Sequence, residues 1–217
     1  MSPILPVPFL LISVALLIRA EFRGERRQIC FFKPLSTLLV ILIAALSWGR
    51  PGAEPGYTIG ILLGLLLSLG GDVALIFSSR AFLAGLLLFL LAHVVYAVTF
   101  TLFSGFHPGD LISGAVLLAL ALALYRYLKP AEKKMRGPVV AYILIICFMV
   151  NRAVSVFGGA AFSSAQAWLV SAGAILFWIS DLMLGINRFG RPFKYHRLSL
   201  AFYYGGQLLI ALSPSYF

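Results

Sequence analysis

The stretch "YTIGILLGLLLSLGGDVALIFS", residues 57–78, is apolar over almost its whole length. At 1.5 Å per residue, a helix of this length spans about 33 Å, which is enough to cross the hydrocarbon core of a membrane. One carboxylate, Asp72, interrupts the apolar run near its end. An aspartate inside a membrane helix costs about 3 kcal/mol, so Asp72 needs either a partner or a function.

The rest of the chain is similarly apolar. Of its 217 residues, 61% are hydrophobic and only 11% are charged, and the mean hydropathy is +1.00. A soluble domain carries roughly twice this charged fraction. We therefore expect an all-α, polytopic membrane helix bundle in a single domain. The predicted transmembrane helices number about eight and cover residues 4–20, 34–48, 57–78, 81–103, 110–127, 138–157, 166–186 and 197–212.

The basic residues predict how these helices cross the membrane. Of the 17 Lys and Arg residues, 15 fall in the loops after the first, third, fifth and seventh predicted helices. Because cytoplasmic loops are rich in Lys and Arg, we expect both termini outside. The same loops explain the net charge of +10 without a nucleic-acid partner, since they lie against anionic lipid. The first apolar run has no basic residue before it, so we interpret it as a retained helix in a bacterial inner membrane protein.

Two of the seven acidic residues, Asp72 and Asp181, lie inside predicted helices. Both helices run in the same direction in the predicted topology, and each acid lies five or six residues before the end of its helix. Their carboxyl groups are therefore expected about 8–9 Å below the cytoplasmic boundary, where they can face each other if the two helices are neighbours. The local sequences "GGDVALIF" and "WISDLMLGI" are alike, which also indicates a weak internal duplication of a four-helix unit.

Other polar residues are spaced so that they share helix faces at this level. His93, Tyr96 and Phe100 follow an i, i+3, i+7 pattern, and Tyr203 and Gln207 an i, i+4 pattern. The residues expected around a polar cavity are His93, Tyr96, Tyr142, Asn151, Tyr203 and Gln207. His93 and Asn151 are expected deeper in the membrane than the two acids.

Each of these residues has a structural alternative: the acids can pair with Lys or Arg, and buried histidine or tyrosine often only fills a hydrogen-bonded packing position. Several enzyme classes are excluded by pattern, because the chain has no G-x-S-x-G or H-E-x-x-H motif. The sequence "LGGD" also lacks the first glycine of the G-x-G-D signature of intramembrane aspartyl proteases. Cys30 and Cys147 suit neither a disulfide framework nor a metal site, and we expect no metal.

Five segments taken together resemble the lysoplasmalogenase family of membrane proteins, also called YhhN-like. They are "SLGGDVALIF", "GLLLFLLAHVVYAVTF", "AYILIICFMVNRAV", "GAILFWISDLMLGINRF" and "AFYYGGQLLIAL". The resemblance covers roughly residues 33–212. It implies an eight-helix hydrolase that cleaves the vinyl ether of lysoplasmalogen to a fatty aldehyde and glycerophosphoethanolamine or glycerophosphocholine. It also implies that Asp72 and Asp181 are the two acids of the family, with His93, Tyr96, Tyr142, Tyr203 and Gln207 as their companions.

Two nearby carboxylates suit this reaction if one keeps a proton and the other is ionised, as in glycosidases. The protonated acid would donate to the vinyl ether, and the carboxylate would stabilise the cation and activate water. Lys33, Arg80 and Arg188 are candidates to bind the headgroup phosphate. No cofactor is expected, and the partners are the lysophospholipid and membrane lipid. The alternatives are a proton-coupled transporter, in which the acids relay protons, and a lipid-binding protein.

Overall fold

The computed structural model describes residues 2–48, 50, 52–77, 81–128, 133–190 and 193–216. Within these ranges the chain forms eight α-helices, three short 3₁₀ helices and no strand, which confirms the predicted all-α fold. The α-helices are α1 (Val7–Arg23), α2 (Arg26–Ala45), α3 (Pro55–Phe77), α4 (Phe82–Ser104), α5 (Gly109–Leu128), α6 (Lys133–Ser155), α7 (Ser164–Phe189) and α8 (Ser199–Leu212). The 3₁₀ helices are η1 (Val156–Gly158), η2 (His196–Leu198) and η3 (Ser213–Tyr216).

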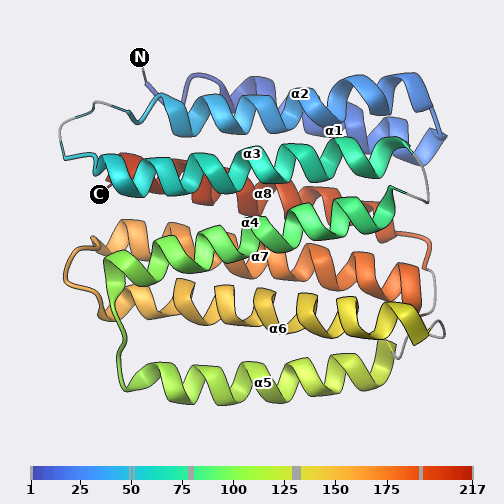
Figure 1. The fold of residues 1–217 in the computed structure, drawn as a ribbon. Coiled ribbons are helices and arrows are strands. Elements are labelled where there is room, and N and C mark those ends of the chain that lie inside the picture. Colours follow the sequence, from blue (N-terminus) through green and yellow to red (C-terminus); the bar gives the residue numbers. More distant parts are fainter. Residues whose placement is uncertain are drawn as a thin grey trace.

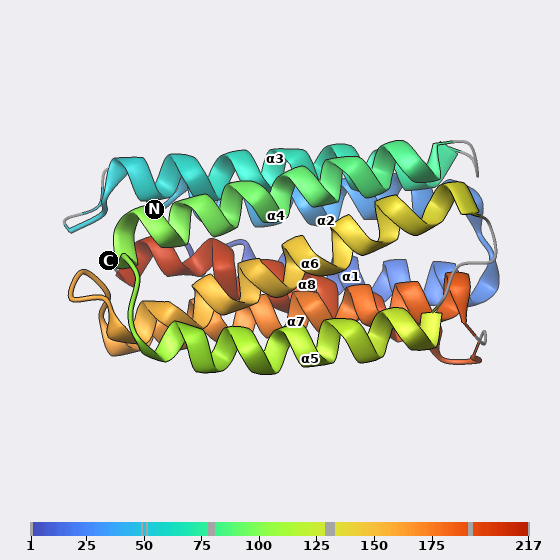
Figure 2. The same ribbon diagram turned by 60° about the horizontal axis from the view of Figure 1, so that its bottom comes forward.

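The helices lie side by side along a common direction, and successive helices run antiparallel to each other (Figure 1). Both termini lie at the same end of the bundle, opposite the turn between α1 and α2 (Figures 1 and 2). Helix α5 forms an edge, where it packs against α6 and α7. This arrangement brings the ends of α3 and α7 that carry the two intramembrane acids to the same end of the bundle.

Six helices in the described part of the chain, α2 to α7, are long and apolar enough to cross a membrane. The chain is therefore a multi-pass membrane protein. Helices α1 and α8 have 17 and 14 residues. Helix α8 is only about 21 Å long, shorter than the hydrocarbon core of a typical bilayer.

The predicted starts of two helices are wrong. The predicted helices begin at Pro34 and Pro138, but α2 begins at Arg26 and α6 at Lys133, so both prolines lie inside their helices. Each proline removes one backbone hydrogen bond from its helix, and the helix continues on both sides of the proline. The longer α2 places Lys33 one turn before Thr37, on the same helix face and directed into the bundle.

The two helices with intramembrane acids are not neighbours among the described residues. Helix α3 packs against α2, α4 and α8, whereas α7 packs mainly against α6 and α8. The condition under which the two acids were expected to face each other is therefore not met.

Helices α7 and α8 approach each other closely at two glycines. A Cβ atom added to Gly206 would lie 2.6 Å from the carbonyl oxygen of Gly173 and 2.8 Å from the backbone nitrogen of Phe177. Small residues at such crossings allow membrane helices to pack backbone to backbone.

We expect Gly206→Ala to cost about 1–3 kcal/mol of stability, because the backbones must move apart. The midpoint of thermal unfolding in detergent should fall by several degrees. Gly137→Ala in α6 is the matched control, since a Cβ there meets nothing within 4 Å. Equal unfolding midpoints for the two variants would contradict the close packing of α7 on α8.

Candidate functional site

Asp181 of α7 lies at the centre of a small hydrogen-bonded cluster contributed by three helices. Its Oδ2 accepts a hydrogen bond of 2.5 Å from the hydroxyl of Tyr142 on α6. The same oxygen lies 3.0 Å from Nε2 of His93 on α4, which is also 3.1 Å from the Tyr142 hydroxyl. The predicted companions His93 and Tyr142 are thus brought to Asp181.

The hydrogen bonds of His93 indicate which ring nitrogen carries its proton. His93 is fully buried, and its Nδ1 has no hydrogen-bond partner among the described residues. A buried N–H without an acceptor is costly, so we assign the proton of a neutral ring to Nε2. His93 then donates towards Asp181, and its ring packs edge-on against Phe177 at 4.7 Å between centroids.

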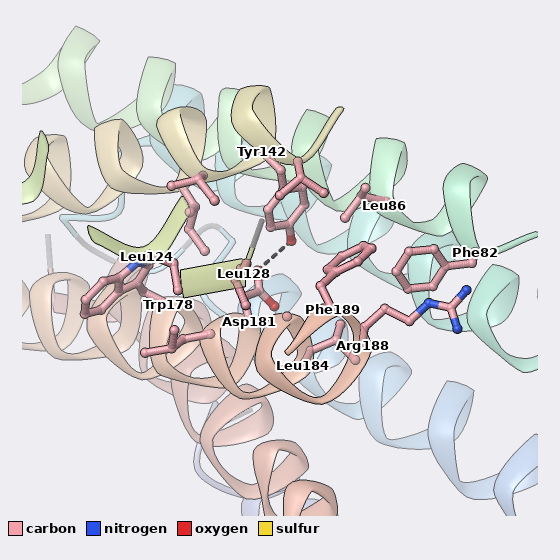
Figure 3. A pocket seen from close by; sticks show the side chains of 15 residues that line it. Phe82, Leu86, Leu124, Leu128, Tyr142, Trp178, Asp181, Leu184, Arg188 and Phe189 are labelled. Carbon is pink, nitrogen blue, oxygen red and sulfur yellow. Dashed lines mark hydrogen bonds between the residues drawn. The ribbon is translucent and has the colours of Figure 1, made fainter. Parts of the chain in front are cut away.

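An apolar pocket opens beside Asp181 between α4, α5, α6 and α7 (Figure 3). The cavity volume is about 50 Å³. The Oδ1 atom of Asp181 has no hydrogen-bond partner in the described part of the chain, and the Asp181 side chain is 11% exposed. One carboxyl oxygen is therefore held by two donors, and the other is left available to the pocket.

The pocket has a defined order of groups along one face of α7. Trp178, Asp181 and Arg188 share this face, and Figure 3 shows Trp178 and Arg188 at opposite ends of the pocket with Asp181 between them. Arg188 lies about 10 Å further along the helix axis than Asp181. Apart from these residues and Tyr142, the lining side chains are apolar. The pocket thus offers an apolar end, a carboxyl group and a basic mouth, in that order.

Asp72 belongs to a second cluster, which is buried and does not line this pocket. Its Oδ2 accepts hydrogen bonds from Thr37 at 2.6 Å and Tyr203 at 2.8 Å, and its Oδ1 lies 3.5 Å from Nζ of Lys33. Lys33 was predicted as a phosphate ligand, but it is 8% exposed and pairs with Asp72. The hydroxyl of Tyr204 also bonds to the backbone carbonyl of Lys33.

Tyr96 and Gln207 extend this second cluster. The Tyr96 hydroxyl donates to Oε1 of Gln207 at 3.0 Å, and Nε2 of Gln207 donates to the Tyr203 hydroxyl at 3.4 Å. The ring of Phe177 lies between the two clusters, packed against the Tyr203 ring at 5.2 Å and against His93. No hydrogen bond between described residues joins the carboxyl groups of the two acids.

Asn151 lies apart from both clusters. Its amide donates to the backbone carbonyl of Asp110 at 2.9 Å and to the hydroxyl of Ser113 at 2.7 Å. This position is nine residues beyond Tyr142, about 14 Å along α6. Next to it, the buried Arg152 forms an ion pair of 2.6 Å with Asp110. Asn151 therefore belongs to a contact between α5 and α6, away from the pocket.

Trp178 and the apolar pocket are not among the features predicted from the sequence. A signal was present, because Trp178, Asp181, Gly185 and Arg188 recur at intervals of three and four residues on one helix face. Within the ranges that the structure describes, no group of three His, Cys, Asp or Glu side chains could hold a metal ion. The candidate phosphate ligand Arg80 lies outside the described residues.

One family model matches most of the chain. The model of the YhhN family matches residues 28–214, which include both acid clusters. The chain belongs to the YhhN family. No solved structure matches the chain.

Curated relatives include animal proteins with an enzyme name. Human lysoplasmalogenase TMEM86A is 36% identical over 187 residues, which cover 83% of this chain and 74% of the human protein. Human lysoplasmalogenase TMEM86B is 34% identical over 86% of this chain and 76% of its own length. The match to bovine lysoplasmalogenase TMEM86A, at 36% identity, spans 70% of this chain and 64% of the bovine protein. A membrane protein named YhhN from Escherichia coli is 29% identical over 93% of this chain and 94% of its length.

Proposed function

We propose that this protein hydrolyses the vinyl ether bond of lysoplasmalogen within the membrane. The observation that carries the proposal is the pocket at Asp181, which combines an apolar end, a single available carboxyl oxygen and a basic mouth. A lysoplasmalogen has the same order of groups: an alkyl chain, a vinyl ether and a glycerophosphate headgroup. The names of the animal relatives support the same reaction.

In this reaction Asp181 acts first as an acid. The proton on its Oδ1 passes to the outer alkene carbon of the vinyl ether, and positive charge develops on the carbon bonded to oxygen. The ionised Asp181 then stabilises this oxocarbenium ion and accepts a proton from the water that attacks it. The resulting hemiacetal breaks its bond to the glycerol oxygen and releases a fatty aldehyde and glycerophosphoethanolamine or glycerophosphocholine.

Tyr142 and His93 support this cycle by donating to Oδ2 of Asp181. Both donors stabilise the negative charge that appears on the carboxyl group when it gives up its proton. They also fix the rotation of the carboxyl group, so that Oδ1 remains directed to the pocket.

We expect Tyr142→Phe to lower kcat about 10-fold with little change in KM, because it removes one donor to Asp181 and keeps the ring. Initial rates of aldehyde release over a range of lysoplasmalogen concentrations measure both constants. Tyr125→Phe in α5 is a matched control, as Tyr125 does not line the pocket. A raised KM with unchanged kcat would assign Tyr142 to substrate binding instead.

Asp72 has a different part in this proposal from the one the sequence predicted. The proposal makes Asp181 the reacting carboxyl group and Asp72 a buried partner of Lys33 that holds Tyr203. Tyr203 in turn supports Phe177, and Phe177 supports the His93 ring. In this role Asp72 positions the wall behind the reacting group and does not touch the substrate.

The proposed placement in the membrane follows the basic loops. We propose that α1 and α8 also cross the bilayer, giving eight crossings with both termini outside, in a bacterial inner membrane. Asp181 lies eight residues before the end of α7, about 12 Å along the helix axis. The vinyl ether of a lysoplasmalogen in the cytoplasmic leaflet lies just below its headgroup, which is close to this depth.

The proposal is tested by giving the purified protein a lysoplasmalogen and measuring free aldehyde. The saturated 1-alkyl lysophospholipid is the matched control, because it has no vinyl ether to protonate and should release none. Absence of aldehyde from the unchanged protein would contradict the proposed reaction. Uptake of the intact lipid or of protons into sealed vesicles, without any chemical change, would favour a transporter instead.

A further inference from the structure

We propose that Arg188, stacked on Phe82, forms a phosphate-binding subsite at the mouth of the pocket. The inference rests on the proposed function, since it assigns the headgroup phosphate of the lysophospholipid to this guanidinium. It also identifies a residue that would favour a phospholipid over a neutral ether lipid of the same chain.

The first support is the orientation of the arginine side chain. The Cζ atom of Arg188 lies 4.9 Å from the centroid of the Phe82 ring, and both residues line the pocket (Figure 3). A guanidinium held over an aromatic ring keeps its N–H groups at its edge, where they can bond to a phosphate in a bidentate way. Phe82 thus acts as a platform that limits the rotamers of an otherwise exposed side chain.

The second support is that Arg188 has no carboxylate partner in the part of the chain that the structure describes. Arg152 pairs with Asp110 and Arg197 with Glu21, so these two cations are already neutralised. Lys33, another predicted phosphate ligand, is buried against Asp72. Arg188 is the arginine that combines a place on the pocket wall with an available charge.

The third support is the position of Arg188 relative to the reacting carboxyl group. Arg188 lies about 10 Å beyond Asp181 along α7, on the side of the basic loops. In the substrate the glycerol backbone likewise separates the vinyl ether from the phosphate, so the two groups follow the same order along the pocket as Asp181 and Arg188. An alkyl chain directed towards Trp178 then leaves the phosphate at the mouth.

The subsite can be tested by binding, independently of cleavage. The ligands are a saturated 1-alkyl lysophospholipid and the 1-alkylglycerol of the same chain length, which has no phosphate. We expect Arg188→Gln to weaken binding of the phospholipid about 10- to 100-fold, the range for a hydrogen bond between charged groups. Binding of the alkylglycerol should stay within about twofold, which also shows that the variant is folded.

Arg126→Gln is the matched control, because Arg126 lies in the last turn of α5 at the same end of the bundle and does not line the pocket. It should leave both affinities unchanged. If both variants weaken phospholipid binding equally, the effect comes from general surface charge, and the subsite is overturned. Equal loss of both ligands in Arg188→Gln, or no loss of either, would overturn it as well.

A cleavage assay separates this inference from the proposed reaction. If the binding pattern holds and the unchanged protein releases no aldehyde, the subsite stands and the proposed hydrolysis fails. If aldehyde is released and Arg188→Gln binds the phospholipid normally, the hydrolysis stands and the subsite fails.

Discussion

Asp181→Asn should lower the rate of aldehyde release from lysoplasmalogen by about 10²–10⁴-fold, the usual contribution of a general acid. The amide oxygen can still accept the hydrogen bonds of Tyr142 and His93, so the shape of the cluster is preserved. The amide cannot donate a proton to the alkene carbon, and it carries no negative charge to stabilise the cation. The loss should therefore appear in kcat, with KM changed by only a few-fold.

The matched control for Asp181→Asn is the same change at a carboxylate outside the pocket. Glu54→Gln makes the same chemical change before α3, outside the pocket, and should keep the full rate. Thermal unfolding in detergent should show that Asp181→Asn remains folded. If Asp181→Asn releases aldehyde at a rate within a few-fold of the unchanged protein, Asp181 takes no part in the reaction.

The helices could be predicted from the sequence because each apolar block is close to the length that crosses a membrane. The errors arose at Pro34 and Pro138, because the predicted helices begin with the apolar blocks, whereas α2 and α6 extend into the basic residues that precede them. For the same reason Lys33, which is predicted in a loop, lies within α2 and is buried in the bundle.

The two acids could be identified because an aspartate among apolar residues is costly. Their separation could not be predicted, since helix direction and depth do not determine which helices pack together. His93 was expected deeper than the acids, yet its side chain reaches Asp181. In the predicted helices His93 lies twelve residues from the end of the bundle that carries the two acids, and Asp181 only five. In the observed helices α4 and α7 the two distances are eleven and eight residues, a difference of only about 4–5 Å along the axis.

The pocket could not be derived from the pattern of residues. It depends on how the side chains of α4, α5, α6 and α7 meet, and its wall consists mainly of leucine, isoleucine and phenylalanine that any membrane helix contains.

The separation of the two acids allows the role of Asp72 to be tested apart from that of Asp181. If Lys33 neutralises Asp72 within the bundle, the charge of Asp72 stabilises the fold and takes no part in catalysis.

Asp72→Asn alone should therefore destabilise the protein by about 3–5 kcal/mol, because it leaves the buried Lys33 without its counter-charge. The double variant Lys33→Met with Asp72→Asn should recover most of this stability. Its amide oxygen can still accept from Thr37 and Tyr203, as the carboxylate does. Thermal unfolding of both single variants and the double variant measures the coupling.

The same double variant decides whether Asp72 takes part in the chemistry. If Asp72 only positions Tyr203, the double variant should release aldehyde at a rate within about 10-fold of the unchanged protein, since the pocket at Asp181 is intact. A double variant that is as stable as the unchanged protein but loses about 10²-fold or more of the rate would restore Asp72 as a second catalytic carboxylate. That outcome would require the layer of Phe177 and Tyr203 to move when substrate binds, so that the two acids come together at the vinyl ether.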